Sequence, residues 1–161
     1  KYFYTMKKLI ILLLLISFNA IGAGTSSNTV DSSETSDQII TLYELAEKHI
    51  DNQSYDKSLK LLKKLTKRED LGTKRADIYN LLGFSYRKLE NPDLDKSFAA
   101  YMMAIEIDPS HLGAHEYLGE LYLMRDQKDK AVIILKKLDQ LAGSNTEEYR
   151  ELKIAIDEYQ S

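Results

Sequence analysis

The stretch HLGAHEYLGELYL, residues 111–123, decides the fold of this chain. Apolar residues recur in it every three or four positions around the small Gly119, which is the pattern of a helix that packs closely against a neighbour. Further on, Ala131, Leu135 and Leu138 continue the same spacing in a second segment. Together the two segments predict a helical hairpin over residues 110–143.

The same arrangement occurs twice upstream, so the chain contains a repeat. Residues 76–109 carry Leu82-Gly83 at the equivalent place, and residues 38–72 carry Leu45-Ala46 in a more degenerate copy. Small residues at these positions let the two helices of a hairpin approach closely. Each hairpin leaves an apolar face that only its neighbour can cover, so the units predict one continuous core.

Seven helical segments follow from this pattern, with only 7 Gly and 2 Pro in the chain to interrupt them. The last segment has Asn145 or Thr146 as its N-cap and an apolar stripe at helical spacing, which is typical of a capping helix. The segments are expected at about 37–51, 54–67, 74–89, 93–107, 111–125, 128–142 and 145–160.

The N-terminal part has the pattern of a secretory signal peptide over residues 1–23, with an upstream extension before Met6. Lys7 and Lys8 precede the apolar run 9–16, and small residues follow, with cleavage after Gly22 or Ala23. An apolar run of this length is too short to span a bilayer comfortably, although a retained anchor stays an alternative. The signal peptide predicts an exported, periplasmic protein with no membrane span in the mature chain.

Residues 24–37 are rich in Ser and Thr and almost free of apolar side chains. Such a segment has no burial to offset the entropy of ordering, so it is expected to be a flexible linker. The helical domain then covers residues 38–160.

Composition restricts the function. Cysteine is absent, which excludes disulfides and thiolate metal sites, and the net charge of −3 gives no reason to expect nucleic acid as a partner. The sequence contains no Gly-rich phosphate loop and no nucleophile elbow. A non-enzymatic protein without a cofactor is therefore expected.

On these residues the chain resembles the tetratricopeptide repeat (TPR) family over residues 38–160. The stretch at 111–123 and the Glu-Glu-Tyr at 147–149 also look like a group of exported proteobacterial tetratricopeptide proteins. The resemblance implies an all-α fold, a right-handed α-solenoid of three helical hairpins with a C-terminal capping helix. It also implies that the concave face binds a protein or peptide partner.

In the family, the first helix of each hairpin lines the groove that holds the partner. Arg87 and Lys88 would pair with a carboxylate of a bound peptide, and Phe84 would receive an apolar side chain. The carboxylate clamp of chaperone-binding relatives is absent from the matching positions. The groove residues that the resemblance implies are Tyr43, Glu47 and Asp51, then Asp77, Asn80, Phe84, Arg87 and Lys88, then His111, Glu116, Glu120 and Met124.

Two further interpretations stay open. His111 and His115 are spaced as a metal-binding pair on a helix would be, but His115 occupies the large aromatic position of the repeat, so a buried packing role is favoured and no metal is predicted. The alternative to partner binding is a structural homo-oligomer that assembles through the first hairpin or the capping helix.

Overall fold

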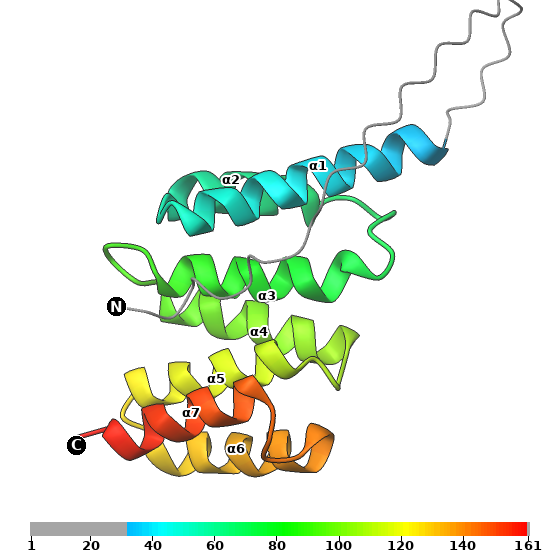
Figure 1. Ribbon diagram of the computed structural model, residues 1–161. Helices are drawn as coiled ribbons and strands as arrows, with labels where there is room; N and C mark the ends of the chain where they lie inside the picture. Colours follow the sequence, from blue (N-terminus) through cyan, green and yellow to red (C-terminus); the bar gives the residue numbers. More distant parts are fainter. Residues whose placement is uncertain (1–31, 161) are drawn as a thin grey trace, which may run out of the picture.

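The computed structural model describes residues 32–160, and these form seven α-helices without a strand. The prediction of an all-helical stack of hairpins is confirmed (Figure 1). The helices are α1 (Ser32–Asp51), α2 (Tyr55–Leu65), α3 (Lys74–Arg87), α4 (Leu94–Ile107), α5 (Leu112–Met124), α6 (Lys128–Ala142) and α7 (Glu147–Glu158).

Antiparallel pairs build the stack. α1 packs on α2, α3 on α4 and α5 on α6, while α2 against α3 and α4 against α5 join one hairpin to the next. α7 packs on both helices of the third hairpin and closes the lower end in Figure 1. The core is therefore a column of buried side chains that runs the length of the stack.

The first helix begins earlier than the sequence predicts. α1 starts at Ser32, so the prediction of a linker over residues 24–37 is wrong for its last six residues. The reason is cooperative: Ile39 is buried at 4% exposure and anchors the helix, and extending a nucleated helix costs little. Thr41 Oγ1 also donates to the carbonyl of Asp37 at 2.8 Å. The predicted signal peptide and residues 24–31 lie outside the described residues.

Small residues allow close approach at two helix crossings. A Cβ on Gly83 would lie 2.6 Å from the ring of Tyr101, and Ser97 Oγ donates to the Gly83 carbonyl at 2.8 Å. A Cβ on Gly119 would lie 2.5 Å from Leu152 on α7. Gly83 thus serves the crossing within its own hairpin, as predicted, whereas Gly119 makes room for the capping helix.

Side-chain caps set where three of the helices begin. Asp93 accepts from the amide of Lys96 at the start of α4, and Thr146 accepts from the amide of Tyr149 at the start of α7. Between the two predicted caps for the last helix, the structure selects Thr146. His111 Nδ1 accepts from the amide of Ala114 and caps α5. Capping by His111 fixes one of its ring nitrogens, which matters for the groove.

Candidate partner-binding groove

The concave face of the stack is formed by the first helices of the hairpins. α1 contacts α3, and α3 contacts α5, whereas α2 makes no contact with α4, nor α4 with α6. Helices that approach each other more closely lie on the inside of a curved stack, so α1, α3 and α5 form the concave side and α2, α4 and α6 the convex side. All the predicted groove residues lie on the three inner helices or at their ends.

Aromatic rings form the floor of this face next to the C-terminal end of α3. The Phe84 ring lies 5.1 Å from Tyr117 and 6.2 Å from Tyr55, centroid to centroid, and Tyr117 lies 6.1 Å from Tyr101. Phe84 is only 8% exposed and Tyr101 is fully buried. The Phe84–Tyr55 contact is edge-to-face and the other two are tilted, and together these contacts link the three hairpins. In contrast to Phe84 and Tyr101, Tyr55 and Tyr117 are only half-buried.

Arg87 is buried in this aromatic cluster. It is 5% exposed, and its guanidinium carbon lies 5.5 Å from the Phe84 centroid and 5.3 Å from the Tyr117 centroid. It forms an ion pair with Glu120, and its Nε donates to the Tyr101 hydroxyl at 3.3 Å. The prediction that Arg87 is available to a ligand carboxylate is wrong, because Glu120 already neutralises it inside the protein.

The electrostatics of Arg87 agree with this internal role. Burial alone would lower the pKa of Arg87, but the neighbouring Tyr101 and Glu120 more than offset that effect, so the net shift is upward. Burial also raises the pKa of Tyr101 to about 12. Arg87 therefore stays charged and Tyr101 stays neutral across the ordinary pH range.

Lys88 follows directly and has the opposite character. Its side chain is exposed, and its Nζ lies 5.6 Å from the centroid of Phe84. Partial burial and the charge of Arg87 lower the pKa of Lys88. Lys88 thus provides a positive group at the surface, directly beside the aromatic floor.

Four carboxyl groups interact electrostatically between α5 and α7: Glu116, Glu120, Glu148 and Glu151. Glu116 lies one turn before Glu120, and burial, followed by the charges of Glu120, Glu148 and Glu151, raises the pKa of Glu116 to about 9. Glu116 therefore holds its proton at neutral pH. A protonated carboxyl can donate a hydrogen bond, as a carboxylate cannot.

A second group of predicted residues lies at the other end of the inner helices, where α3 and α5 begin. His111 Nδ1 accepts from a backbone amide at 3.2 Å, so its proton is on Nε2, which faces Asp77 Oδ1 at 3.2 Å. This contact with His111 is the main cause of the lowered pKa of Asp77. Nδ1 of His111 is thereby occupied by the cap, whereas its buried Nε2 lies beside Asp77 without a hydrogen bond of good geometry.

The remaining predicted residues differ in exposure. Tyr43 and Asn80 are both 8% exposed, and Lys74 Nζ lies 4.6 Å from the Tyr43 centroid. Burial raises the pKa of Glu47, which is also hydrogen-bonded by Tyr43. Met124 is 46% exposed at the C-terminal end of α5. Tyr43 and Asn80 belong to the core more than to a surface.

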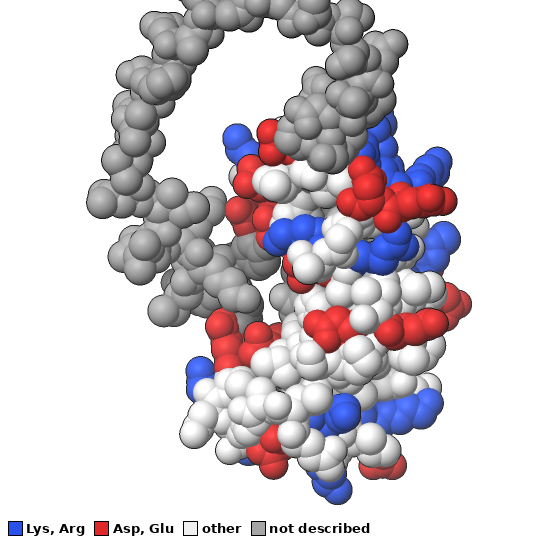
Figure 2. All heavy atoms as spheres, turned by 90° about the vertical axis from the view of Figure 1, so that its right-hand side faces the viewer, with Lys and Arg blue, Asp and Glu red and all other residues white. Residues whose placement is uncertain are grey.

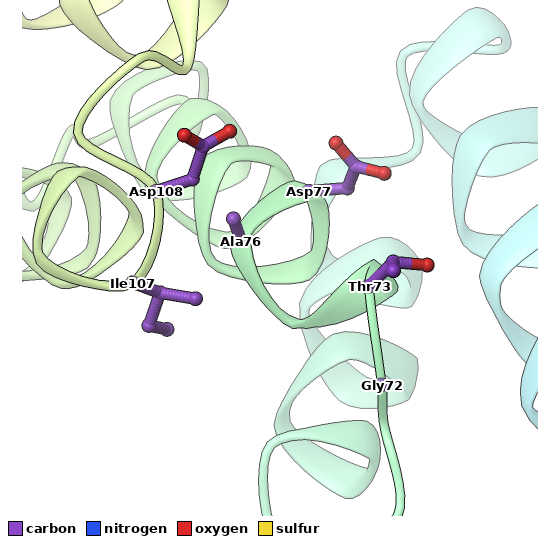
Figure 3. Close-up of a pocket in the computed structure, with 6 residues that line it drawn as sticks. All are labelled: Gly72, Thr73, Ala76, Asp77, Ile107 and Asp108. Carbon is purple, nitrogen blue, oxygen red and sulfur yellow. The ribbon is translucent and has the colours of Figure 1, made fainter.

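A small hollow lies at the end of the molecule where α3 and α5 begin. Seen from that end, side chains of both charges are spread over the surface (Figure 2). Gly72, Thr73, Ala76, Asp77, Ile107 and Asp108 line the hollow (Figure 3). Asp108 accepts from the Ser110 amide and hydroxyl, and Asp77 is engaged by His111. Both carboxylates are therefore occupied by partners within the chain.

Solved structures share this arrangement. The crystal structure of MamA matches with a TM-score of 0.62 and 21% identity over 78% of this chain and 70% of that chain. The first TPR of Spaghetti (RPAP3), bound to the HSP90 peptide SRMEEVD, matches with a TM-score of 0.64 and 16% identity over 76% of this chain and 95% of that chain. The Yersinia enterocolitica type III secretion chaperone SycD, in complex with a peptide of the translocator YopD, matches with a TM-score of 0.63 and 19% identity over 81% of this chain and 92% of that chain. The fold is a tetratricopeptide-repeat solenoid.

Two comparisons of the sequence itself find no relative of this chain. No family model matches the chain, and no curated protein matches it. Within residues 32–160 no helix has both the length and the apolar character needed to cross a membrane. The same residues contain no group of three or more potential metal ligands, and His115 is buried with Nε2 3.0 Å from the Pro109 carbonyl oxygen.

Glu116 makes the stability of the solenoid depend on pH. Because folding raises its pKa from 4.5 to about 9, its contribution is complete below about pH 4.5, falls as the pH rises, and is lost above about pH 9. Glu116→Gln keeps a neutral side chain, so we expect the variant to gain stability relative to the parent as the pH rises through this window. Urea unfolding at a series of pH values measures this difference.

Taking the difference between the two proteins removes the other titrating groups. Asp77 and Asp108 have lowered pKa values and titrate below the window. Burial lowers the pKa of His115 and raises the pKa values of Glu47 and Glu151, and these three groups are present in both proteins. A constant difference in unfolding free energy from pH 5 to pH 9 would contradict a raised Glu116 pKa.

Sequence reasoning missed Tyr55 and Tyr117, which complete the aromatic floor. Tyr117 lies one position after Glu116 on the same helix, so its place on the inner helix was a detectable signal. Tyr55 comes from the start of α2, a second helix of its hairpin, and the repeat pattern gives no signal for it.

Proposed function

We propose that this protein is a non-enzymatic scaffold of the bacterial cell envelope that binds a peptide segment of a partner protein on its concave face. The observation that carries the proposal is the aromatic floor around Phe84 with the exposed Lys88 beside it, on the inner side of a tetratricopeptide solenoid. Two of the similar structures, Spaghetti and SycD, contain a bound peptide.

The chemistry of the face specifies the peptide. An apolar or aromatic side chain of the peptide would pack on Tyr117, which is half-buried beside the buried Phe84, and an adjacent carboxylate would pair with Lys88. The proton on Glu116 would be donated to a main-chain carbonyl of the peptide. Because Arg87 is paired with Glu120 inside the protein, Lys88 is the residue that would bind a negative charge of the ligand in this part of the groove.

Charge reversal at Lys88 tests the groove. Peptides that bind the full chain are first selected from a displayed library. Their affinities for the parent and for Lys88→Glu are then measured by calorimetry. We expect the variant to lose affinity on the order of 10- to 100-fold, because an attraction becomes a repulsion beside a desolvated ring. The matched control is Lys136→Glu, which makes the same exposed charge change on the convex helix α6. Equal losses in both variants would reject the groove.

The location in the envelope is part of the proposal and rests on the signal-peptide pattern of residues 6–23. Fractionation of expressing cells, followed by N-terminal sequencing of the purified protein, tests it. We expect a mature chain that begins after Gly22 or Ala23 in the periplasmic fraction. A cytoplasmic chain that keeps residues 6–23 would overturn the location without affecting the groove.

The alternative of self-association stays a prediction. The exposed side of α7 carries charged residues such as Arg150, and Lys153 is paired with Asp157 at 2.6 Å. A charged end of this kind suits contact with water better than burial in an obligate interface. Light scattering over a range of concentrations separates a monomer from an oligomer.

A further inference from the structure

The outward face of α2 is a row of lysines. Four of them lie on α2 at a spacing that places them on one side of the helix, within about a third of its circumference, opposite the buried Ser58, Leu59, Leu62 and Leu65. The fifth, Lys67, lies in the turn that follows α2. All five are exposed, and no ion pair within residues 32–160 involves any of them. We call this surface the lysine stripe: Lys57, Lys60, Lys63, Lys64 and Lys67.

Acidic residues are few along the stripe, although Lys63 Nζ lies 5.0 Å from the Tyr86 centroid and the charge of Lys63 helps to lower the pKa of Asp93. The single acidic residue of α2 is Asp56, in its first turn. Figure 2 shows blue side chains along the upper right-hand edge, with red side chains between them. Residues 32–160 carry five more acidic than basic residues in total, so the positive charge of this helix stands out against an acidic molecule.

The composition of the stripe argues against a protein partner. Protein interfaces are enriched in Tyr, Trp and Arg and depleted in Lys, and their affinity comes from buried aromatic or apolar anchors. The stripe contains no Arg, and α2 has no exposed large apolar residue within the described part of the chain. Lysine is a compact, strongly hydrated charge that attracts an anionic surface without needing a fixed geometry.

The sequence before the first hairpin favours a membrane over a nucleic acid as that surface. The apolar run 9–16, preceded by Lys7 and Lys8, directs this end of the chain to a bilayer, whether it is later cleaved or retained. The 15 residues 17–31 separate it from α1, and a chain of that length reaches about 50 Å when extended. The first hairpin therefore enters its compartment beside a phospholipid surface.

We propose that the lysine stripe docks the solenoid on an anionic phospholipid surface. Each lysine near such a surface contributes about 1 kcal/mol, so several together give useful binding even without insertion of an apolar group. The acidic remainder of the domain is repelled, which orients the molecule with α2 toward the headgroups. Because α2 is on the convex side, the concave face stays open, and this proposal stands independently of the groove.

Vesicle binding tests the proposal. The full chain is mixed with phosphatidylcholine vesicles with or without phosphatidylglycerol, and the bound fraction is measured by co-sedimentation. The stripe variant replaces four lysines by glutamine: Lys57→Gln, Lys60→Gln, Lys64→Gln and Lys67→Gln. We expect it to lose affinity for the anionic vesicles on the order of 100-fold or more. Binding of the parent should also weaken steeply with added salt.

The control variant removes the same charge from the convex helix α6: Lys128→Gln, Lys130→Gln, Lys136→Gln and Lys137→Gln. It should keep anionic-vesicle binding within about threefold of the parent, because it leaves the stripe intact. Vesicles of phosphatidylcholine alone report any binding by residues 9–16, which are the same in all three proteins. Equal losses in the two variants, or an unchanged stripe variant, would overturn the proposal.

Competition separates lipid from other anions. DNA and polyglutamate are added to the vesicle mixture at matched charge. If either binds the stripe more tightly than the anionic vesicles and displaces the protein, the surface belongs to that class of partner and the lipid proposal is wrong. All the substituted lysines are exposed, so an unchanged thermal midpoint in each variant confirms that the fold is retained.

Discussion

Tyr101→Ala is expected to lower the free energy of unfolding by about 4 kcal/mol, because it removes a large, fully buried side chain and leaves a cavity. The Tyr101 ring fills the space above Gly83, where no Cβ is present, and lies 6.1 Å from the Tyr117 centroid. Urea or guanidinium unfolding followed by circular dichroism measures the change.

Tyr101→Phe separates the ring from the hydroxyl. Phenylalanine keeps the packing against Gly83 but removes the oxygen that accepts from Arg87 Nε. The expected loss is about 1 to 2 kcal/mol, the cost of leaving a buried donor without its partner. If Phe and Ala cost the same, the hydroxyl rather than the ring holds this part of the core, and the packing argument would be wrong.

Glu120→Ala is expected to cost about 3 kcal/mol, because it leaves the buried Arg87 guanidinium without its carboxylate. The measurement is denaturant unfolding of the parent and the variant at the same pH. The result bears on function as well, because the same ion pair holds α3 and α5 together beneath the aromatic floor.

An apolar replacement of the whole pair is the control. Arg87→Met combined with Glu120→Leu removes both charges together, so no buried ion is left alone, and the double variant should recover to within about 1 kcal/mol of the parent. Arg87→Met alone should cost less than Glu120→Ala, because Glu120 is 27% exposed and can be solvated. A double variant as unstable as Glu120→Ala would show that the pair stabilises the fold through more than mutual neutralisation.

The repeat made most of the fold predictable. Small residues at Ala46, Gly83 and Gly119, together with apolar residues at fixed spacing, fit a single arrangement of helical hairpins. The helices begin and end within a few residues of the predicted limits. The start of α1 could not be predicted in the same way. Residues 32–37 have no apolar pattern of their own, and their helix depends on the anchoring of Ile39 further along.

The groove was predictable in location and less so in chemistry. The repeat register placed Phe84, Arg87 and Lys88 on the inner helix α3, and the structure has them there. It could not indicate that Glu120, on the next hairpin, would take the charge of Arg87. Which of two adjacent cations is buried depends on side-chain contacts between hairpins, and neither spacing nor residue type records those contacts.

The curvature of the stack has a consequence for how many things the protein can hold at once. The exposed surface of the inner helices α1, α3 and α5 and the exposed surface of the outer helix α2 lie on opposite sides of the stack. Two ligands on opposite faces share no contact residue and need not compete. A molecule of this shape can act as an adaptor. A peptide bound on the concave face would have a raised effective concentration at a phospholipid surface bound through α2.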